Sequence, residues 1–333
     1  MRKIRNESPS DAKHWVWKGS KSRPIVLGHR GVPRAAQENT MAALEAARKL
    51  GIDGVEIDVQ VTKDNVVVLF HDSDMGRLTG GAAKGKDIAD LTYAEIQQYK
   101  IPKNLDATGT GKLVEFECGD QNIPTLEEAL VSFPDLKFNV EMKAYSPKFS
   151  RRHWGEEVAK VIRKCGAAGQ VIVTSFDFFM LKELEKEYPG LQSGWAYDDG
   201  MASSLKDASE QWFQEQDPND DGDIETFEPT VNGKGFIRWL MESDKVGRAV
   251  GATVVDLAWT VIDKDTIEKF HKRGQAVGVY CFHPYDVSFV QTPLSEEEEE
   301  RVIRRLVKEG CDWVETDDPE KMMALLDKIE AGQ

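Results

Sequence analysis

Residues 25–59, IVLGHRGVPRAAQENTMAALEAARKLGIDGVEIDV, decide the fold. The stretch opens with an apolar run, Ile25 to His29, and closes with a second one, Gly54 to Val59. Between them, Met41 to Leu50 has a helical pattern. Asn39-Thr40 before it are good N-cap residues, and Gly51 after it is a typical helix stop. The stretch therefore predicts a strand, a helix and a second strand.

Short β-rich runs continue to alternate with helical patterns along the rest of the chain. Most of them are nearly unbroken apolar runs, as expected for strands that are covered on both faces. The six further runs span residues 138–142, 171–176, 193–197, 253–257, 276–282 and 313–316. Eight strands that alternate with helices predict an α/β fold, a (β/α)₈ TIM barrel over residues 23–330 that follows an N-terminal extension, residues 1–22.

A ninth apolar run, Val66 to Phe70, follows the second strand after only the four residues Thr62 to Asn65. This spacing is typical of a hairpin and is too short for a parallel crossover, so we predict a returning arm outside the count of eight. A turn near Asp64 would place His71 roughly opposite Asp58.

Two connections, residues 73–136 and 198–252, are too long for ordinary barrel loops, and we interpret them as insertions. The second contains DPNDDGDIETFE, residues 217–228, which matches the calcium loop D-x-[DN]-x-[DN]-G-x₅-E. A helix over residues 205–216 is expected before this loop, whereas Pro229 disfavours one after it. The segment is either a single EF-hand-like loop that binds a structural Ca²⁺ or an acidic surface turn. The Ca²⁺ ligands would be Asp217, Asn219, Asp221, Asp223 and Glu228.

The 333 residues include 58 acidic and 43 basic side chains, a formal charge of −15. This excess argues against non-specific binding to nucleic acid or an anionic membrane, so an anionic substrate must meet a local cluster of positive charge. No stretch reaches the roughly 18 apolar residues of a membrane span. The N-terminus has no apolar signal-peptide core, and the four cysteines form no CxxC pair. A cytoplasmic protein with reduced thiols is expected, and the sequence defines no oligomeric state.

Polar side chains occur where the predicted strands end, and TIM barrels carry their active sites at this end of the strands. Residues two apart on a strand point to one face, so Glu56 faces the same way as Asp58, and Glu141 the same way as Lys143. With the residues that end the first strand and the arm, these positions supply the candidate site residues His29, Arg30, Glu56, Asp58, His71, Glu141 and Lys143.

These residue types favour chemistry on a phosphate beside a divalent cation. Three carboxylates buried together are costly unless a cation joins them. Oxygen-only ligation by Glu56, Asp58 and Glu141 suits Mg²⁺ or Ca²⁺ rather than Zn²⁺. The arginine and the lysine of the set supply positive charge for a phosphate. The two histidines suggest an acid and a base, because unperturbed imidazoles titrate near neutrality.

The motifs HRG, ENT, EID, FHD and ExK occur in this order between residues 29 and 143. Together with IPTLEEAL and NVEMKA, they resemble the glycerophosphodiester phosphodiesterase family. The resemblance implies a metal-dependent TIM barrel with a family-type insertion at residues 73–136. It also implies hydrolysis of small glycerophosphodiesters to sn-glycerol 3-phosphate and an alcohol, through a cyclic phosphate formed by the glycerol 2-hydroxyl. Carried over by motif, His29 and His71 would be the acid/base pair, Arg30 and Lys143 the phosphate clamps, and Glu56, Asp58 and Glu141 the metal ligands.

Two positions depart from the family pattern. Gln37 stands where the family usually has proline before ENT, and Asn39 is still expected to cap the helix. A late strand ends in Tyr280-Cys281-Phe282-His283-Pro284, where the family often has Trp-Thr. His283 is either a surface residue or a third functional histidine, and the leaving group remains open.

Aromatic residues at the strand ends have two interpretations. Phe176, Trp195 and Phe282, with Tyr197 and Trp259 nearby, either line an apolar pocket for the alcohol or pack the barrel. Two alternative functions also follow. One is a lysophospholipase D-type activity, and the other is a catalytically dead barrel that binds calcium. The presence of all seven candidate site residues argues against the second.

Overall fold

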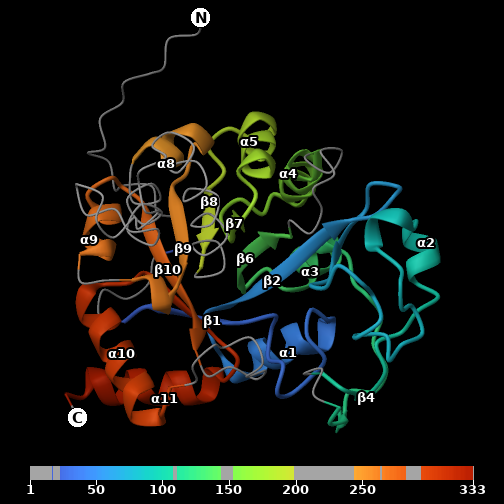
Figure 1. Ribbon diagram of the computed structural model, residues 1–333, viewed down its shortest axis with the longest axis horizontal. Coiled ribbons are helices and arrows are strands. Elements are labelled where there is room, and N and C mark those ends of the chain that lie inside the picture. The colour runs from blue at the N-terminus through green and yellow to red at the C-terminus, as the bar shows by residue number, and fades with distance from the viewer. Residues whose placement is uncertain are drawn as a thin grey trace, which may run out of the picture.

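The computed structural model describes residues 17, 23–107, 111–143, 153–198, 244–262, 265–282 and 294–332. Its centre is a closed barrel of eight parallel strands, because β1 pairs with both β2 and β11 (Figure 1). The eight are β1 (Ile25–Gly28), β2 (Gly54–Val61), β6 (Lys137–Met142), β7 (Val171–Ser175), β8 (Ser193–Tyr197), β9 (Val254–Ala258), β10 (Ala276–Phe282) and β11 (Trp313–Thr316). Each coincides with one of the predicted runs, so the TIM-barrel prediction is confirmed.

Helices surround the barrel and cover the outward apolar side chains of its strands (Figure 1). They are α1 (Met41–Leu50), α3 (Leu126–Ser132), α4 (Trp154–Cys165), α5 (Phe178–Glu187), α8 (Asp244–Val250), η4 (Trp259–Val261), α9 (Thr266–His271), α10 (Glu296–Glu309) and α11 (Pro319–Glu330). Several begin where the sequence predicts. Ser295 caps α10 in a capping box with Glu298, and four acidic residues of its first turn favour the helix dipole. None of the helices in the described residues has the length and apolar content that a bilayer crossing requires.

The arm predicted after β2 is β3 (Val67–Leu69), which pairs antiparallel with β2. The register sets Leu69 against Val59, and the Phe70 amide donates to the Asp58 carbonyl. Phe70 therefore stands opposite Asp58, and His71 follows one residue later. The prediction for His71 was off by one position.

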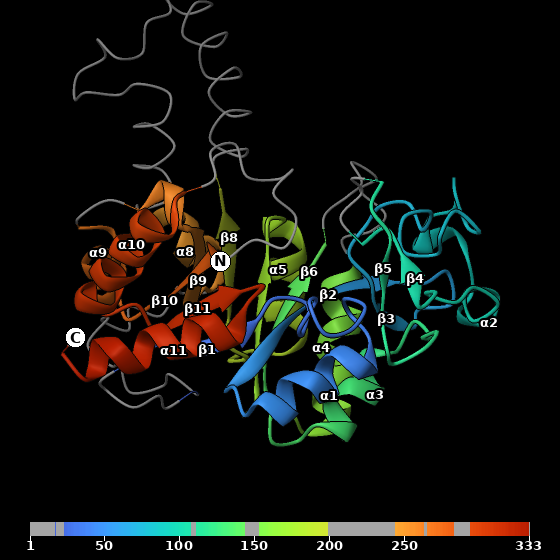
Figure 2. The ribbon, with the colours of Figure 1, turned by 90° about the horizontal axis from the view of Figure 1, so that it is seen from below.

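Residues 73–136 include a compact unit beside the β2–β3 hairpin. It contains η2 (Ile88–Asp90), α2 (Tyr93–Ile96), β4 (Asn104–Leu105) and β5 (Val114–Glu115). Figures 1 and 2 both show α2 and β4 to one side of the barrel, away from α9 and α10. A separate apolar cluster, including Val68, Phe70 and Ile96, holds this unit against the outer face of the hairpin.

The floor of the barrel lies at the N-terminal ends of the strands. Apolar residues such as Ile25, Val254 and Trp313 form a cluster there, and Trp17 of the N-terminal extension completes it. The rings of Trp17 and Trp313 meet edge to face at 6.2 Å. Space for the Trp313 ring exists because Gly278 has no side chain, since a Cβ there would lie 1.8 Å from it. Trp17 therefore closes the barrel from below.

Replacing Trp17 with alanine is expected to destabilise the fold by about 3 kcal/mol, because a fully buried indole is lost and a cavity remains. A lower midpoint of urea unfolding would measure the effect, with Trp17→Phe as the control that keeps a ring. An unchanged midpoint for Trp17→Ala would show that the indole does not support the barrel.

Candidate active site

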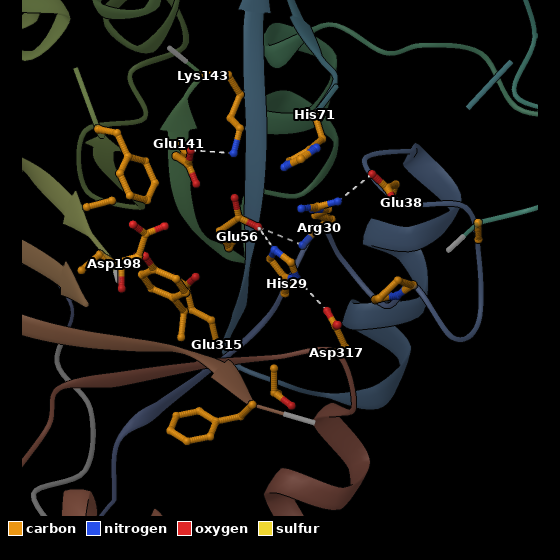
Figure 3. Close-up of a pocket in the computed structure, with 18 of the residues that line it drawn as sticks. His29, Arg30, Glu38, Glu56, His71, Glu141, Lys143, Asp198, Glu315 and Asp317 are labelled. Atoms are coloured by element: carbon orange, nitrogen blue, oxygen red, sulfur yellow. Dashed lines mark hydrogen bonds and ion pairs between the residues drawn. The ribbon is translucent and has the colours of Figure 1, made fainter. Parts of the chain in front are cut away.

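The pocket lies at the C-terminal ends of the barrel strands and has a volume of about 330 Å³. Six of the seven predicted residues line it, and the seventh, Asp58, is fully buried beside them. Figure 3 shows Glu56, Glu141 and Lys143 in the middle, with His29 and His71 to one side. The barrel thus gathers four separate segments of the chain at one place.

The three predicted metal ligands converge. The register pairs Asp58 of β2 with Glu141 of β6, and Glu56 lies two residues before Asp58 on the same face. One carboxylate oxygen from each of the three lies within 4.8 Å of the others. Burial, reinforced by the neighbouring Asp58, holds the pKa of Glu56 well above its usual range.

The unsatisfied oxygens of this set fit a cation. Glu56 Oε2 accepts a hydrogen bond from the Arg30 backbone amide, but the buried Glu56 Oε1 has no hydrogen-bond partner. Asp58 Oδ1 and Glu141 Oε1 make ion-pair contacts with Lys143 without well-formed hydrogen bonds. A hard divalent cation binds oxygen ligands, and buried carboxylate oxygens that accept no hydrogen bond are suited to it. The residues therefore fit Mg²⁺ or Ca²⁺.

Two cations face this carboxylate cluster. Lys143 Nζ lies 3.0 Å from Asp58 Oδ1 and 2.7 Å from Glu141 Oε1. Arg30 Nε lies 3.3 Å from Asp58 Oδ2, and its Nη1 lies 3.0 Å from Glu38 Oε1. Although burial raises the pKa of Asp58, these cations outweigh it and hold that pKa below its usual range. Arg30 itself has a positive φ of 55°, a strained conformation that the turn of the HRG motif imposes.

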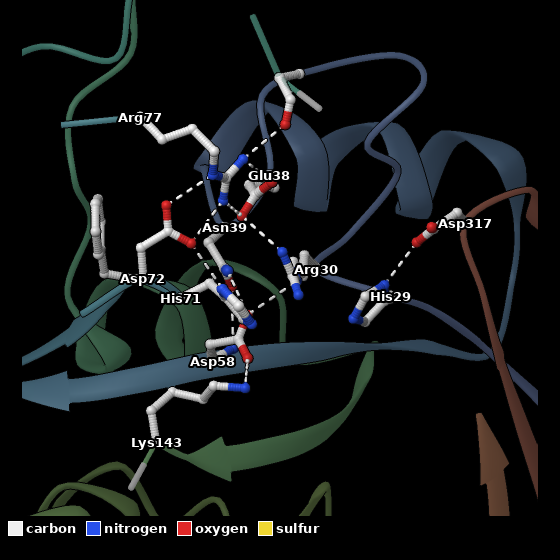
Figure 4. Close-up of polar contacts among 12 residues, drawn as sticks. His29, Arg30, Glu38, Asn39, Asp58, His71, Asp72, Arg77, Lys143 and Asp317 are labelled. Carbon is white, nitrogen blue, oxygen red and sulfur yellow. Dashed lines mark hydrogen bonds and ion pairs between the residues drawn. The ribbon is translucent and has the colours of Figure 1, made fainter. Parts of the chain in front are cut away.

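The two histidines are held in the same way by different carboxylates. His29 Nδ1 lies 2.6 Å from Asp317 Oδ1, and His71 Nδ1 lies 2.8 Å from Asp72 Oδ1 (Figure 4). A carboxylate on Nδ1 fixes the ring and leaves Nε2 for chemistry. His29 Nε2 in turn lies 3.8 Å from Glu56 Oε2.

The environments of the two imidazoles push their pKa values apart. Burial, together with the positive charges of Lys143 and Arg30, lowers the pKa of His71 to about 4. Burial also lowers the pKa of His29, but Asp317 outweighs it and the net shift is upward. Pairs of titratable groups whose environments push their pKa values apart are typical of acid/base sites, and the shifts favour the neutral form of His71 and the protonated form of His29.

A second layer of residues orients this site, and the motifs left it unassigned. Arg77 binds Asp72 through Nε at 2.7 Å and Glu38 through Nη2 at 2.7 Å, and its Nη1 donates to the Ala107 carbonyl (Figure 4). Glu38 thus joins Arg77 to Arg30. Burial alone would raise the pKa of Glu38, but the two arginines lower it to about 2. Asp72 is the last residue of the FHD motif and Asp317 directly follows β11, whereas nothing in the sequence marks Arg77.

The ENT loop differs from expectation in one detail. The cap of α1 is Thr40, whose hydroxyl accepts from the Ala43 amide, and not Asn39. Asn39 has a φ of 55°, and its side chain donates to Asp58 Oδ2 at 2.7 Å and accepts from the Asp58 amide. Gln37, at the position that departs from the family, donates to the carbonyls of Pro102 and Gly119 and ties this loop to the insertion.

The two interpretations of the strand-end aromatic residues, pocket wall and barrel packing, each apply to some of them. Phe176 and Phe282 line the pocket. Trp195 lies instead in the outer core and packs edge to face on Phe270 at 6.0 Å. On β8 the pocket receives Ala196, with Asp198 just beyond the strand, so residues of the other parity point outward.

The predicted Ca²⁺ loop, residues 217–228, and His283 lie outside the described residues. Both remain predictions. The thiols of Cys118, Cys165 and Cys311 are free.

Comparison with known proteins agrees with this geometry. Residues 29–321 match the model of the glycerophosphoryl diester phosphodiesterase family. The chain is 34% identical over 181 residues to the glycerophosphodiester phosphodiesterase of Caldanaerobacter subterraneus, across 54% of this chain and 69% of that protein. It is 32% identical over 153 residues to the human lysophospholipase D GDPD1, but the match covers 42% of this chain and only 47% of that protein.

Solved structures show the same fold. A phosphodiesterase of Oleispira antarctica, in complex with the product sn-glycerol-3-phosphate, superposes with a TM-score of 0.60 at 21% identity, covering 92% of this chain and 97% of the other. A glycerophosphodiester phosphodiesterase of Agrobacterium tumefaciens gives a TM-score of 0.58 at 19% identity, covering 90% and 99%.

Proposed function

The chain belongs to the glycerophosphoryl diester phosphodiesterase family, and we propose that it hydrolyses glycerophosphodiesters to sn-glycerol 3-phosphate and an alcohol by metal-assisted acid/base catalysis. The observation that carries this proposal is the pair of imidazoles beside the carboxylate cluster. Each imidazole has its Nδ1 on a carboxylate, and their pKa values are shifted in opposite directions.

In the first half of the proposed reaction, His71 Nε2 accepts the proton of the glycerol 2-hydroxyl as its oxygen forms a bond to phosphorus. His29 donates its proton to the leaving alcohol oxygen as the other P–O bond breaks. Arg30 and Lys143 hold the non-bridging phosphate oxygens. A divalent cation on Glu56, Asp58 and Glu141 would neutralise charge that grows on the phosphate.

In the second half, water opens the resulting five-membered cyclic phosphate. His29, now neutral, accepts the proton of the attacking water, and protonated His71 returns its proton to the glycerol 2-oxygen. Both histidines end in their starting states, so the cycle is balanced. Asp72 and Asp317 keep the two Nε2 atoms directed at the pocket throughout.

The direct test is to follow the hydrolysis of glycerophosphocholine by the purified chain. We expect release of sn-glycerol 3-phosphate and choline, with 1,2-cyclic glycerophosphate detectable by phosphorus NMR early in the reaction. Removing divalent ions with a chelator is expected to lower the rate at least about a hundredfold, and Mg²⁺ or Ca²⁺ should restore it. Full activity in the chelator would contradict the role of the carboxylate cluster, and no turnover with any ion would contradict the proposed function.

Lysophospholipids are a second candidate substrate, because the pocket has an aromatic wall and a human relative carries the name lysophospholipase D. Hydrolysis of lysophosphatidylcholine at a rate comparable to that of glycerophosphocholine would support this reading. A preference of more than about a hundredfold for the soluble diester would exclude it. The alternative of a dead barrel is disfavoured, because all seven candidate residues are present and gathered at one site.

A further inference from the structure

The wall of the pocket that faces away from His71 and Arg30 is acidic and aromatic. Asp198 lies across the pocket from these two residues (Figure 3). Asp256 of β9 and Glu315 of β11 lie deeper, on the strands that flank β10. We call the set Phe176, Asp198, Asp256, Tyr280, Phe282 and Glu315 the acidic wall.

A built network holds the two deep carboxylates. The Asn139 side-chain amide donates to Asp256 Oδ2 at 2.8 Å and to Glu315 Oε1 at 2.7 Å. Thr174 donates to the oxygen of the same amide, which fixes its orientation, and Trp313 Nε1 donates to Glu315 Oε1 at 3.0 Å. The carboxylates are therefore rigidly placed and not free to turn away from the pocket.

The two carboxyl groups also hydrogen-bond to each other, and burial with the neighbouring Glu315 raises the pKa of Asp256 well above its usual range. The pair keeps negative charge that no lysine or arginine in the described part of the chain binds directly. Asp256 and Glu315 are each only 3% exposed. Asp256 Oδ1 is buried without a hydrogen-bond partner. All donors to the pair are neutral groups, whereas the cations of the pocket are engaged by Glu38, Asp58, Asp72 and Glu141. A buried carboxylate without a bound cation costs free energy. A positively charged group on the substrate would lower that cost by pairing with the wall.

The aromatic members select the kind of positive charge. Phe176 and Phe282 line the pocket together with the carboxylates, and Tyr280 is held by a hydrogen bond from its hydroxyl to the Tyr197 carbonyl. Aromatic faces next to a carboxylate favour a bulky, weakly hydrated cation, such as a substituted ammonium, over a compact metal ion.

We propose that the acidic wall binds a substituted ammonium group on the alcohol half of the substrate, so that the chain prefers glycerophosphodiesters of cationic amino alcohols. This inference rests on the proposed function and specifies its substrate class. Glu315 and Asp256 are then specificity-determining residues rather than members of the acid/base machinery.

The test compares kcat/KM for glycerophosphocholine and glycerophosphoethanolamine with that for glycerophosphoglycerol, whose leaving group is neutral, at saturating divalent ion. The wild-type chain is expected to prefer the cationic substrates at least about tenfold. Glu315→Gln keeps the shape of the side chain and one hydrogen-bond acceptor. It should lower the preference for cationic substrates about tenfold and leave kcat/KM for the neutral substrate nearly unchanged. Asp256→Asn serves as the second variant, and Glu320→Gln, exposed on α11, as the control that keeps the preference.

Each other outcome is decisive. Equal turnover of cationic and neutral substrates by the wild-type chain would overturn the inference and leave the proposed function standing. An equal loss on all substrates in Glu315→Gln would show that the pair serves a part common to them, such as the glycerol hydroxyls. If Glu315→Gln needed a higher divalent-ion concentration than the wild type for half-maximal activity, the pair would contribute to binding the ion and not the ammonium group. No turnover of any substrate would instead contradict the proposed function.

Discussion

Replacing His71 with asparagine is expected to lower kcat/KM for glycerophosphocholine at least about a hundredfold, because general base catalysis contributes roughly 10²–10⁴ in rate. The side chain keeps a polar group near Asp72 but loses the Nε2 that faces the pocket. His71 is well suited to the base role because burial and the charges of Lys143 and Arg30 lower its pKa to about 4, which keeps it neutral at physiological pH. The loss should fall on kcat, because the asparagine leaves both phosphate clamps in place.

His153→Asn is the matched control, since His153 is exposed at the start of α4 and does not line the pocket. It should retain wild-type activity. If His71→Asn kept more than about a tenth of the wild-type kcat with an unchanged thermal midpoint, another group would have to be the base. If the variant lost activity and its thermal midpoint also fell, the result would instead indicate a structural role for His71.

The motifs predicted which side chains the barrel brings together because each lies on a strand or directly after one, where topology leaves little freedom. Glu56 and Asp58 share a face by strand parity, and the parallel register of β2 and β6 then sets Asp58 beside Glu141. Parity also explains why Trp195 packs the barrel and does not line the pocket. Strands of a TIM barrel are covered on both faces, so the apolar sequence of β8 does not reveal which residues point inward.

Residues that act through another side chain were harder to find. Arg77 reaches Asp72 and Glu38 from the insertion, and only the packing of that unit against the hairpin brings it there. Asp256 and Glu315 were missed for a different reason. Each is a single acidic residue within a mostly apolar strand, and the two are close because β9 and β11 flank β10 in the barrel.

The metal ligands give the second large effect. Glu56→Gln and Glu141→Gln are each expected to lower kcat about a thousandfold at a fixed Mg²⁺ or Ca²⁺ concentration, since a bound ion supplies several kcal/mol of stabilisation to the transition state. Titration calorimetry should show the ion affinity of both variants falling in parallel with activity. Glu127→Gln, on the exposed part of α3, is the matched control with the same change in charge.

Stability separates the loss of a ligand from the loss of the fold. Burial and the neighbouring Asp58 raise the pKa of Glu56 in the folded protein. Ionised Glu56 therefore destabilises the ion-free protein at a pH above this folded-state pKa. The cost disappears when the pH falls below the ordinary pKa of a glutamate, because Glu56 is then protonated in both states. Glu56→Gln removes the charge and should therefore melt no lower than the wild type in chelator at neutral pH, while losing the rise in melting temperature that Mg²⁺ or Ca²⁺ confers on the wild type. A variant that melts lower in chelator yet keeps the full ion-induced rise would show that Glu56 supports the fold and binds no ion.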